Sequence, residues 1–259
     1  MSVAFRPPFS LFSRWFVGFA ALVVLLVVLV LPAVSLAAEK GLVTDMSWGT
    51  SSSTQDQTVA AMRDVGAKWS RVNLSWSDIE KSQGSYSASA VSMYDGVVQR
   101  SVNAGVKVII MVDRAPGWAS GSGNIEAPAS DPAKFASFIR WLSAHYAGKV
   151  AAYEIWNEEN TVRFWPAGVN PAQYVALLKA AYPAVKAGDP NAKVLFGGTA
   201  LNDYAFVDAC YAVAPNLGSY YDVMATHPYT SNGADAPETI VRGSDGRIDK
   251  NYFPAYRES

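Results

Sequence analysis

Short apolar runs alternate along this chain with segments in which apolar residues recur at helical spacing, and this alternation constrains the fold more than any other feature. Alternation of this kind is typical of βα units, in which neighbouring strands run parallel and helices cover the sheet. The sequence predicts six such strands, at residues 42–46, 69–74, 106–112, 150–156, 193–196 and 221–226. It predicts five helices between them, at residues 54–65, 88–104, 132–146, 171–187 and 205–212.

The expected helix ends carry local signals. Gly66, Gly105 and Gly188 stand where helices should stop, because glycine readily adopts the left-handed conformation that ends a helix. Asp131 followed by Pro132 predicts an N-cap and the first helical residue. These signals support the predicted helices independently of hydrophobic periodicity.

Two α/β architectures fit six strands. An open doubly wound sheet would use them as they stand, whereas a closed (β/α)8 barrel has eight strands and typically about 250 residues. No GxGxxG motif follows the first strand and no P-loop occurs, so the nucleotide-binding doubly wound folds lose their usual support. The residues alone leave both architectures open.

The N-terminal segment predicts export. Arg6 and Arg14 precede an uncharged, Val- and Leu-rich stretch, and the small residues Ser35 and Ala37 offer a cleavage site just before Ala38. We therefore expect residues 1–37 to be a signal peptide that is removed, leaving a catalytic domain over residues 38–259 outside the cell. The alternative is a signal anchor, since the apolar stretch is long enough to cross a bilayer, and contact with a membrane is expected only in that case.

Composition limits the partners. The chain has 259 residues, only 17% of them charged, and a formal net charge of -1, so it has no basic field for nucleic acid. Cys210 is the one cysteine, and the two histidines have no metal-ligand spacing, so we expect neither an internal disulfide nor a metal or other cofactor. An uncharged partner suits this chain best.

Functional groups collect where the expected strands end. The apolar run that leads to Trp156 stops abruptly at Asn157 and Glu158. A carboxyl group at the end of such a strand is partly desolvated, which raises its pKa and favours the protonated form that a general acid needs. Because adjacent strand residues point to opposite faces, a bulge is needed to bring both side chains into one cleft. Alternation also places Glu154 and Trp156 on the inner side, and Arg71 is the candidate cation to pair with Glu154.

Aromatic and hydrogen-bonding residues occur together at the other strand ends, a mixture that suits the apolar faces and hydroxylated edges of a sugar. The second strand carries Arg71, with Trp76 just beyond it, Trp118 follows the third strand, and His227 and Tyr229 follow the sixth. Core packing is an equally good explanation for any single tryptophan.

Four of these motifs in this order resemble the clan A glycoside hydrolases, nearest to families 39 and 5, which include cellulases and β-xylosidases. They are Trp69-Ser-Arg71, Ala115-Pro-Gly-Trp118, Tyr153-Glu-Ile-Trp-Asn-Glu158 and His227-Pro-Tyr229, and the resemblance covers roughly residues 41–240. It implies an α/β fold of the TIM (β/α)8 barrel type, here incomplete with about six of the eight βα units. The family usually has proline after the acid, where this chain has Glu159.

The resemblance also implies residue roles. Glu158 would be the general acid and base, Asn157 would bind the sugar hydroxyl next to the reacting carbon, and Arg71 would support the nucleophile. His227 and Tyr229 would line the cleft, and Trp76, Trp118 and Trp156 complete the expected substrate-binding set.

In these families the nucleophile is a glutamate at the end of the seventh strand, and no such strand is seen in this sequence. Asp45 and Asp113 lie at strand ends and could serve only an inverting mechanism. We therefore expect a C-terminally truncated, secreted retaining glycosidase that acts on an oligo- or polysaccharide and is itself inactive. The alternative is a carbohydrate-binding pseudoenzyme on the same barrel.

Overall fold

The computed structural model describes residues 38–228, so the expected signal peptide and Tyr229 lie outside the described residues. Within residues 38–228, no helix combines the length and the apolar character that crossing a bilayer requires.

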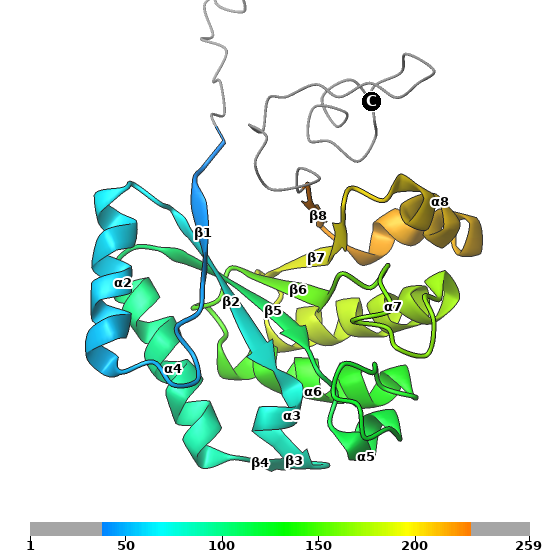
Figure 1. Cartoon of the computed structure of the whole chain (residues 1–259), viewed down its shortest axis with the longest axis horizontal. Coiled ribbons are helices and arrows are strands. Elements are labelled where there is room, and N and C mark those ends of the chain that lie inside the picture. Colours follow the sequence, from blue (N-terminus) through cyan, green and yellow to red (C-terminus); the bar gives the residue numbers. More distant parts are fainter. Residues whose placement is uncertain (1–37, 229–259) are drawn as a thin grey trace, which may run out of the picture. The chain divides into compact units, whose positions relative to one another are not determined.

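Six parallel strands form one sheet in the described residues, in the order β1-β2-β5-β6-β7-β8 (Figure 1). Their order in the sheet is their order in the chain, whereas a doubly wound sheet reverses direction at a switch point. The sheet is therefore six strands of a TIM-type barrel, as expected. The bounds are β1 Gly41–Thr44, β2 Trp69–Ser75, β5 Lys107–Asp113, β6 Ala152–Asn157, β7 Lys193–Ala200 and β8 Val223–His227.

Five longer helices connect these strands, and each begins at a side-chain cap that satisfies a free backbone N–H. The predicted cap at Asp131 is confirmed, because its carboxylate accepts from the Ala133 N–H at 2.9 Å. The helices are α2 Ser52–Asp64, α4 Ala88–Asn103, α6 Pro132–His145, α7 Pro171–Gly188 and α8 Tyr204–Val213.

Two of the three predicted helix stops are confirmed, since Gly66 and Gly105 have positive φ angles of 71° and 72°. Gly188 is different, because it is the last residue of α7 and packs closely against α6. A Cβ atom there would lie 2.0 Å from Ser143 Oγ, so this glycine is required by helix packing rather than by a turn.

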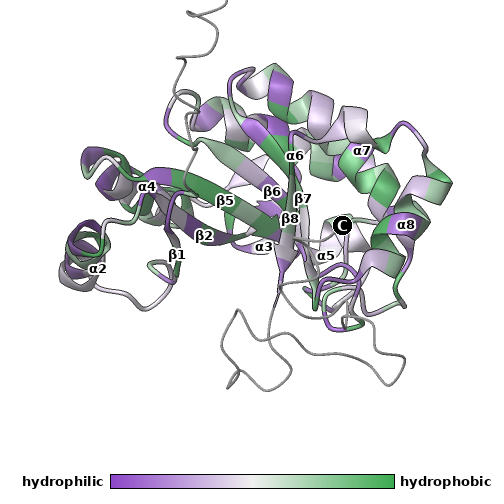
Figure 2. Ribbon diagram, turned by 90° about the horizontal axis from the view of Figure 1, so that it is seen from above, coloured by the Kyte–Doolittle hydropathy of each residue, from purple (hydrophilic) through white to green (hydrophobic). Residues whose placement is uncertain are grey.

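The two faces of the sheet have different roles. Alternate residues such as Val72, Ile110 and Ile155 belong to a buried hydrophobic core that the helices share. Figure 2 shows the helices along the outer side of the strands, with apolar residues on β5 and on α7 and α8. The residues between them, such as Arg71 and Glu154, face the opposite, inner side. The inner side therefore carries the polar chemistry.

Several short elements are absent from the sequence prediction. After β2 the chain forms α3 Trp76–Ile79 and a hairpin of β3 Glu80–Ser82 and β4 Ser85–Tyr86. Helix α5 Gly117–Ser120 follows β5, and a 3-10 helix, η1 Leu217–Tyr220, precedes β8. All are at most four residues long, which is too short for hydrophobic periodicity to reveal.

Candidate active site

A buried ion pair lies at the centre of the polar inner side. Arg71 on β2 donates from Nε to Glu154 Oε2 at 2.6 Å and from Nη2 to Glu154 Oε1 at 2.9 Å. Strand β5 separates the two residues in the sheet, and Glu154 is only 2% exposed. The predicted pairing is confirmed, and it is bidentate, because two N–H groups of the planar guanidinium each bind one carboxylate oxygen.

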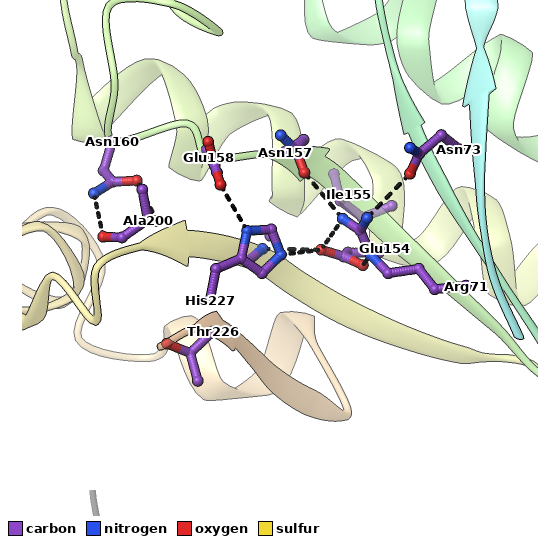
Figure 3. Close-up of polar contacts among 12 residues, drawn as sticks. Arg71, Asn73, Glu154, Ile155, Asn157, Glu158, Asn160, Ala200, Thr226 and His227 are labelled. Carbon is purple, nitrogen blue, oxygen red and sulfur yellow. Dashed lines mark hydrogen bonds and ion pairs between the residues drawn. The ribbon is translucent and has the colours of Figure 1, made fainter. Parts of the chain in front are cut away.

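Arg71 also orients two amides. Its Nη1 donates to Asn73 Oδ1 and its Nη2 to Asn157 Oδ1, both at 3.0 Å (Figure 3). Because the Asn157 oxygen faces the guanidinium, its NH₂ group must point away from it. Asn157 can therefore donate a hydrogen bond to a ligand but has little freedom to turn.

The end of β6 departs from regular strand geometry at Trp156, whose φ angle is 74°. Ile155 and Trp156 both join the outer core, so Asn157 falls on the inner side together with Glu154. The pairing of β6 with β7 keeps its register from Ile155 to Asn157, so no residue is inserted. Asn157 and Glu158 therefore lie on the same side, as predicted, but left-handed residues at Trp156 and Glu158 accompany this arrangement rather than a bulge.

The same distortion corrects the prediction for Trp156. Its side chain is fully buried at 0% exposure, and Nε1 donates to Phe164 O at 2.8 Å. Its ring packs edge-on against Phe135 and Trp165. Trp156 therefore faces the helices and cannot contact a sugar, because strand alternation fails at this residue.

His227, the last residue of β8, contacts the candidate acid. Its Nδ1 lies 2.9 Å from Glu158 Oε1, and its Nε2 lies 3.8 Å from Glu154 Oε1 (Figure 3). Both Glu158 and His227 are partly exposed, at 19% and 16%. The structure thus places the histidine between one buried and one accessible carboxylate.

Two glycines of β7 support this arrangement. A Cβ atom on Gly198 would lie 2.2 Å from His227 Nε2, so only glycine leaves room for the imidazole. The backbone of Gly198 also donates to Glu154 Oε1 and accepts from the Glu158 N–H, both at 3.1 Å. On the other side of the strand, Gly197 leaves room for the carboxyl group of Glu159.

Two further carboxyl groups near the site are buried. Asp113 ends β5 at 2% exposure, and its Oδ1 has no hydrogen-bond partner among residues 38–228. Burial raises the pKa of Asp113 to about 7. Glu159, which the sequence alone places as a charge in a turn, is instead fully buried. In the described part of the chain, no group of three His, Cys, Asp or Glu side chains is arranged to hold a metal ion.

Of the two remaining predicted tryptophans in the described residues, one needs correction. Trp76 is fully buried, and its Nε1 donates to Glu80 Oε2 at 2.6 Å. Trp118 is half-buried, meets Trp76 edge-to-face at 5.7 Å, and donates from Nε1 to Glu80 O. Trp76 therefore offers no face to a sugar, whereas Trp118 packs against the core while staying partly exposed, and its role in substrate binding stays a prediction.

Solved structures with the same fold are glycosidases by their titles. A family 39 glycoside hydrolase from the gut symbiont Bacteroides cellulosilyticus WH2 aligns with a TM-score of 0.65 and 22% identity, over 81% of this chain and 41% of that one. GH5_18 from Streptomyces cattleya, in complex with GlcNAc, aligns with a TM-score of 0.58 and 18% identity, over 76% and 53%. The exo-β-1,4-mannosidase Op5Man5 from Opitutaceae bacterium strain TAV5 gives 0.52 and 18%, over 61% and 31%.

These likenesses show the fold, and the chain spans about half or less of the length of these solved structures. No curated protein matches the chain. Residues 33–252 match the sequence profile described as Cellulase (glycosyl hydrolase family 5). That match includes the strand ends that carry Arg71, Asn157, Glu158 and His227, and it covers most of the sequence. The chain belongs to glycosyl hydrolase family 5.

Proposed function

We propose that this chain provides the acid-base part of a retaining glycoside hydrolase that cleaves O-glycosidic bonds of an oligo- or polysaccharide. Glu158 protonates the leaving oxygen and then activates the water that releases the product. Asn157 donates a hydrogen bond to the hydroxyl next to the reacting carbon. One observation carries the proposal: Asn157 and Glu158 meet on the inner side of β6, where Arg71 and His227 hold them.

The surroundings of Glu158 suit proton transfer. Its carboxyl is 19% exposed, so a glycosidic oxygen can reach it, and the contact to His227 Nδ1 restricts its rotation. Glu154, which lies on the strand that leads to Glu158, is buried, and the ion pair with Arg71 compensates its charge. The names of the solved relatives, which include a GlcNAc complex and an exo-β-1,4-mannosidase, support a saccharide as substrate class.

The nucleophile is proposed to come from outside residues 38–228. A retaining mechanism needs a second carboxylate about 5 to 5.5 Å from the acid. Glu154 is unsuited because both of its oxygens are bound by Arg71, and Asp113 is unsuited because its side chain is buried, at 2% exposure, where a sugar cannot reach it. Glu238 and Glu258 lie outside the described residues. We propose that the 259-residue chain alone does not turn over substrate.

Hydrolysis of aryl glycosides tests both parts of this proposal. The 259-residue chain should show no turnover, whereas a longer form that supplies a further strand ending in glutamate should be active. In the active form, Glu158→Gln should slow hydrolysis of substrates with poor leaving groups by about 10²- to 10⁴-fold. With dinitrophenyl glycosides, whose leaving group needs no proton, the loss in kcat/KM should be much smaller, because kcat/KM reports the first step and not the later attack by water.

The matched control is Asp208→Asn, which removes a carboxylate from the exposed side of α8 and should leave both rates unchanged. Equal losses in kcat/KM on good and poor leaving groups in Glu158→Gln would refute an acid role for Glu158. Turnover by the 259-residue chain itself would refute the proposal that this chain alone is inactive.

A carbohydrate-binding pseudoenzyme is the second candidate. It is favoured by the fact that the described residues present Asn157 and Glu158 without a free second carboxylate beside them. This candidate predicts saturable saccharide binding with no hydrolysis, even by the longer form. Calorimetric titration with a panel of oligosaccharides separates the two candidates.

Export is proposed on the N-terminal segment, which lies outside the described residues. Arg6 and Arg14 followed by an apolar stretch and small residues support a signal peptide removed before Ala38. N-terminal sequencing of the protein from its host tests this, since an intact Met1 in the membrane fraction would favour an anchor instead.

A further inference from the structure

Glu159 has an unusual position for a carboxyl group. It follows the candidate acid directly, yet it is fully buried, and neither carboxylate oxygen has a hydrogen-bond partner from another residue among residues 38–228. A Cβ atom on Gly197 would lie 2.3 Å from Glu159 Oε2, so the carboxyl packs directly against the bare backbone of β7. It therefore lies on the side of the sheet opposite to the cleft.

The titratable groups that act on Glu159 leave its charge uncompensated. They are Glu154 of β6 and Glu158 of the turn, which carry like charge, and Tyr174 of α7 and Cys210 of α8. Burial raises the pKa values of both the Tyr174 hydroxyl and the Cys210 thiol, so neither is charged near neutral pH. Strand β7 packs against the carboxyl with Gly197, and none of the groups acting on Glu159 in the described residues is a cation.

Glu159 is consequently uncharged in the folded protein near neutral pH. Burial raises its pKa to about 8, the two neighbouring carboxylates add to this effect, and only its own backbone N–H opposes it. An ionised carboxylate in this apolar surrounding would be strongly unfavourable. The geometry and the electrostatics thus agree on a protonated side chain.

The Gly197-Gly198 pair connects Glu159 to the cleft. Gly197 touches the Glu159 carboxyl on the outer side, and its N–H donates to the Tyr174 hydroxyl at 2.6 Å. Gly198 touches His227 on the inner side and accepts the Glu158 N–H. A displacement of Glu159 must therefore move the strand that holds both members of the His227–Glu158 contact.

We propose that Glu159 is a positioning residue, whose uncharged carboxyl packs against Gly197 and holds the turn that carries Glu158, and whose ionisation releases that turn. The consequence for catalysis rests on the proposed function of Glu158. The packing and ionisation of Glu159 do not, and the experiments separate the two.

Unfolding by urea between pH 4.5 and 9 tests the ionisation. The folded protein retains the Glu159 proton up to about pH 8, whereas the unfolded chain loses it near 4.5, so stability falls as pH rises through this window and levels off above it. The unfolding constant relative to that of Glu159→Gln should rise by up to tenfold per pH unit, about 10³-fold in total. Asp208→Asn, an exposed carboxylate on α8, should keep the wild-type slope.

Asp113 also titrates in this range but is present in both proteins, so its effect cancels in the ratio. A ratio that stays flat from pH 4.5 to 8 would overturn the proposal. Glu159→Met provides a second uncharged side chain of similar size in case the amide of Gln is poorly accommodated. The proposal would also be overturned if Glu159→Gln and Glu159→Met were both less stable than the wild type at pH 8.

The effect on the turn is read from histidine NMR, which needs no activity. The chain has two histidines, and His145 forms a surface pair with Asp95, so it serves as an internal control for His227. The His227 ring signals should shift with a midpoint near pH 8 in the wild type and lose this step in Glu159→Gln. An identical His227 titration in both proteins would show that Glu159 does not position the turn, whether or not the chain hydrolyses any sugar.

Discussion

Replacing Arg71 by methionine should destabilise the protein more than any other single change on the inner side of the sheet. The substitution removes four hydrogen bonds, two to Glu154 and one each to Asn73 and Asn157, and leaves Glu154 buried with the Gly198 N–H at 3.1 Å. Removing one partner of a buried ion pair typically costs about 3–5 kcal/mol, because the other charge is left uncompensated. For a domain of this size that corresponds to a drop in Tm of about 6–20 °C.

Urea denaturation of a double-mutant cycle tests this reasoning. Glu154→Gln removes the buried charge, so Arg71→Met combined with Glu154→Gln should be more stable than Arg71→Met alone. Arg71→Lys should fall between wild type and Arg71→Met, because lysine keeps the charge but not the bidentate geometry. A loss below about 1 kcal/mol for Arg71→Met, or single effects that simply add in the double mutant, would refute the account of this ion pair.

Three further predictions concern the site and its support. Burial raises the pKa of Asp113 from 3.8 to about 7, so the folded state binds the extra proton between these values and stability falls as pH rises through them. Asp113→Asn lacks this loss and should therefore gain up to about 4 kcal/mol relative to wild type between pH 4 and pH 8 in urea titrations. Gly198→Ala places a methyl group against His227 and should lower saccharide affinity or turnover by about 10²-fold without altering the circular dichroism spectrum. Asp131→Ala should cost about 1 kcal/mol in thermal unfolding, through the lost cap of α6, and should leave saccharide binding unchanged.

The strands and longer helices were predictable because each has its own hydrophobic period and end signals. All six expected strands are present within a few residues of their predicted bounds, and Gly66 and Gly105 end helices as expected. The order of the strands in the sheet was not predictable from apolar runs. Barrels and doubly wound sheets contain the same kind of strand and differ in which strands pair with each other. Gly188 shows a second limit, because a glycine needed for close packing cannot be told in sequence from a glycine needed for a turn.

The site was predictable where it depends on parallel strands ending at one edge. That rule brings Arg71, Glu154 and His227 together regardless of loop details. The error at Trp156 arises because its positive φ turns its own side chain outward and brings Asn157 to the inner side, and nothing in the sequence marks that angle. The burial of Glu159 depends on the neighbouring strand having glycine at position 197, a contact between segments that are 38 residues apart.

The left-handed backbone of Trp156 limits how this region can be engineered for robustness. A tryptophan in this conformation is strained by about 1–3 kcal/mol, and glycine would relieve the strain. Yet glycine would also empty the space that the indole fills between α6 and the loop before α7, where large aromatic deletions cost about 3–5 kcal/mol. Replacing Trp156, whether by glycine to relieve the strain or by a residue more common at this position, should consequently not raise the stability of the protein. Variant libraries should keep this residue.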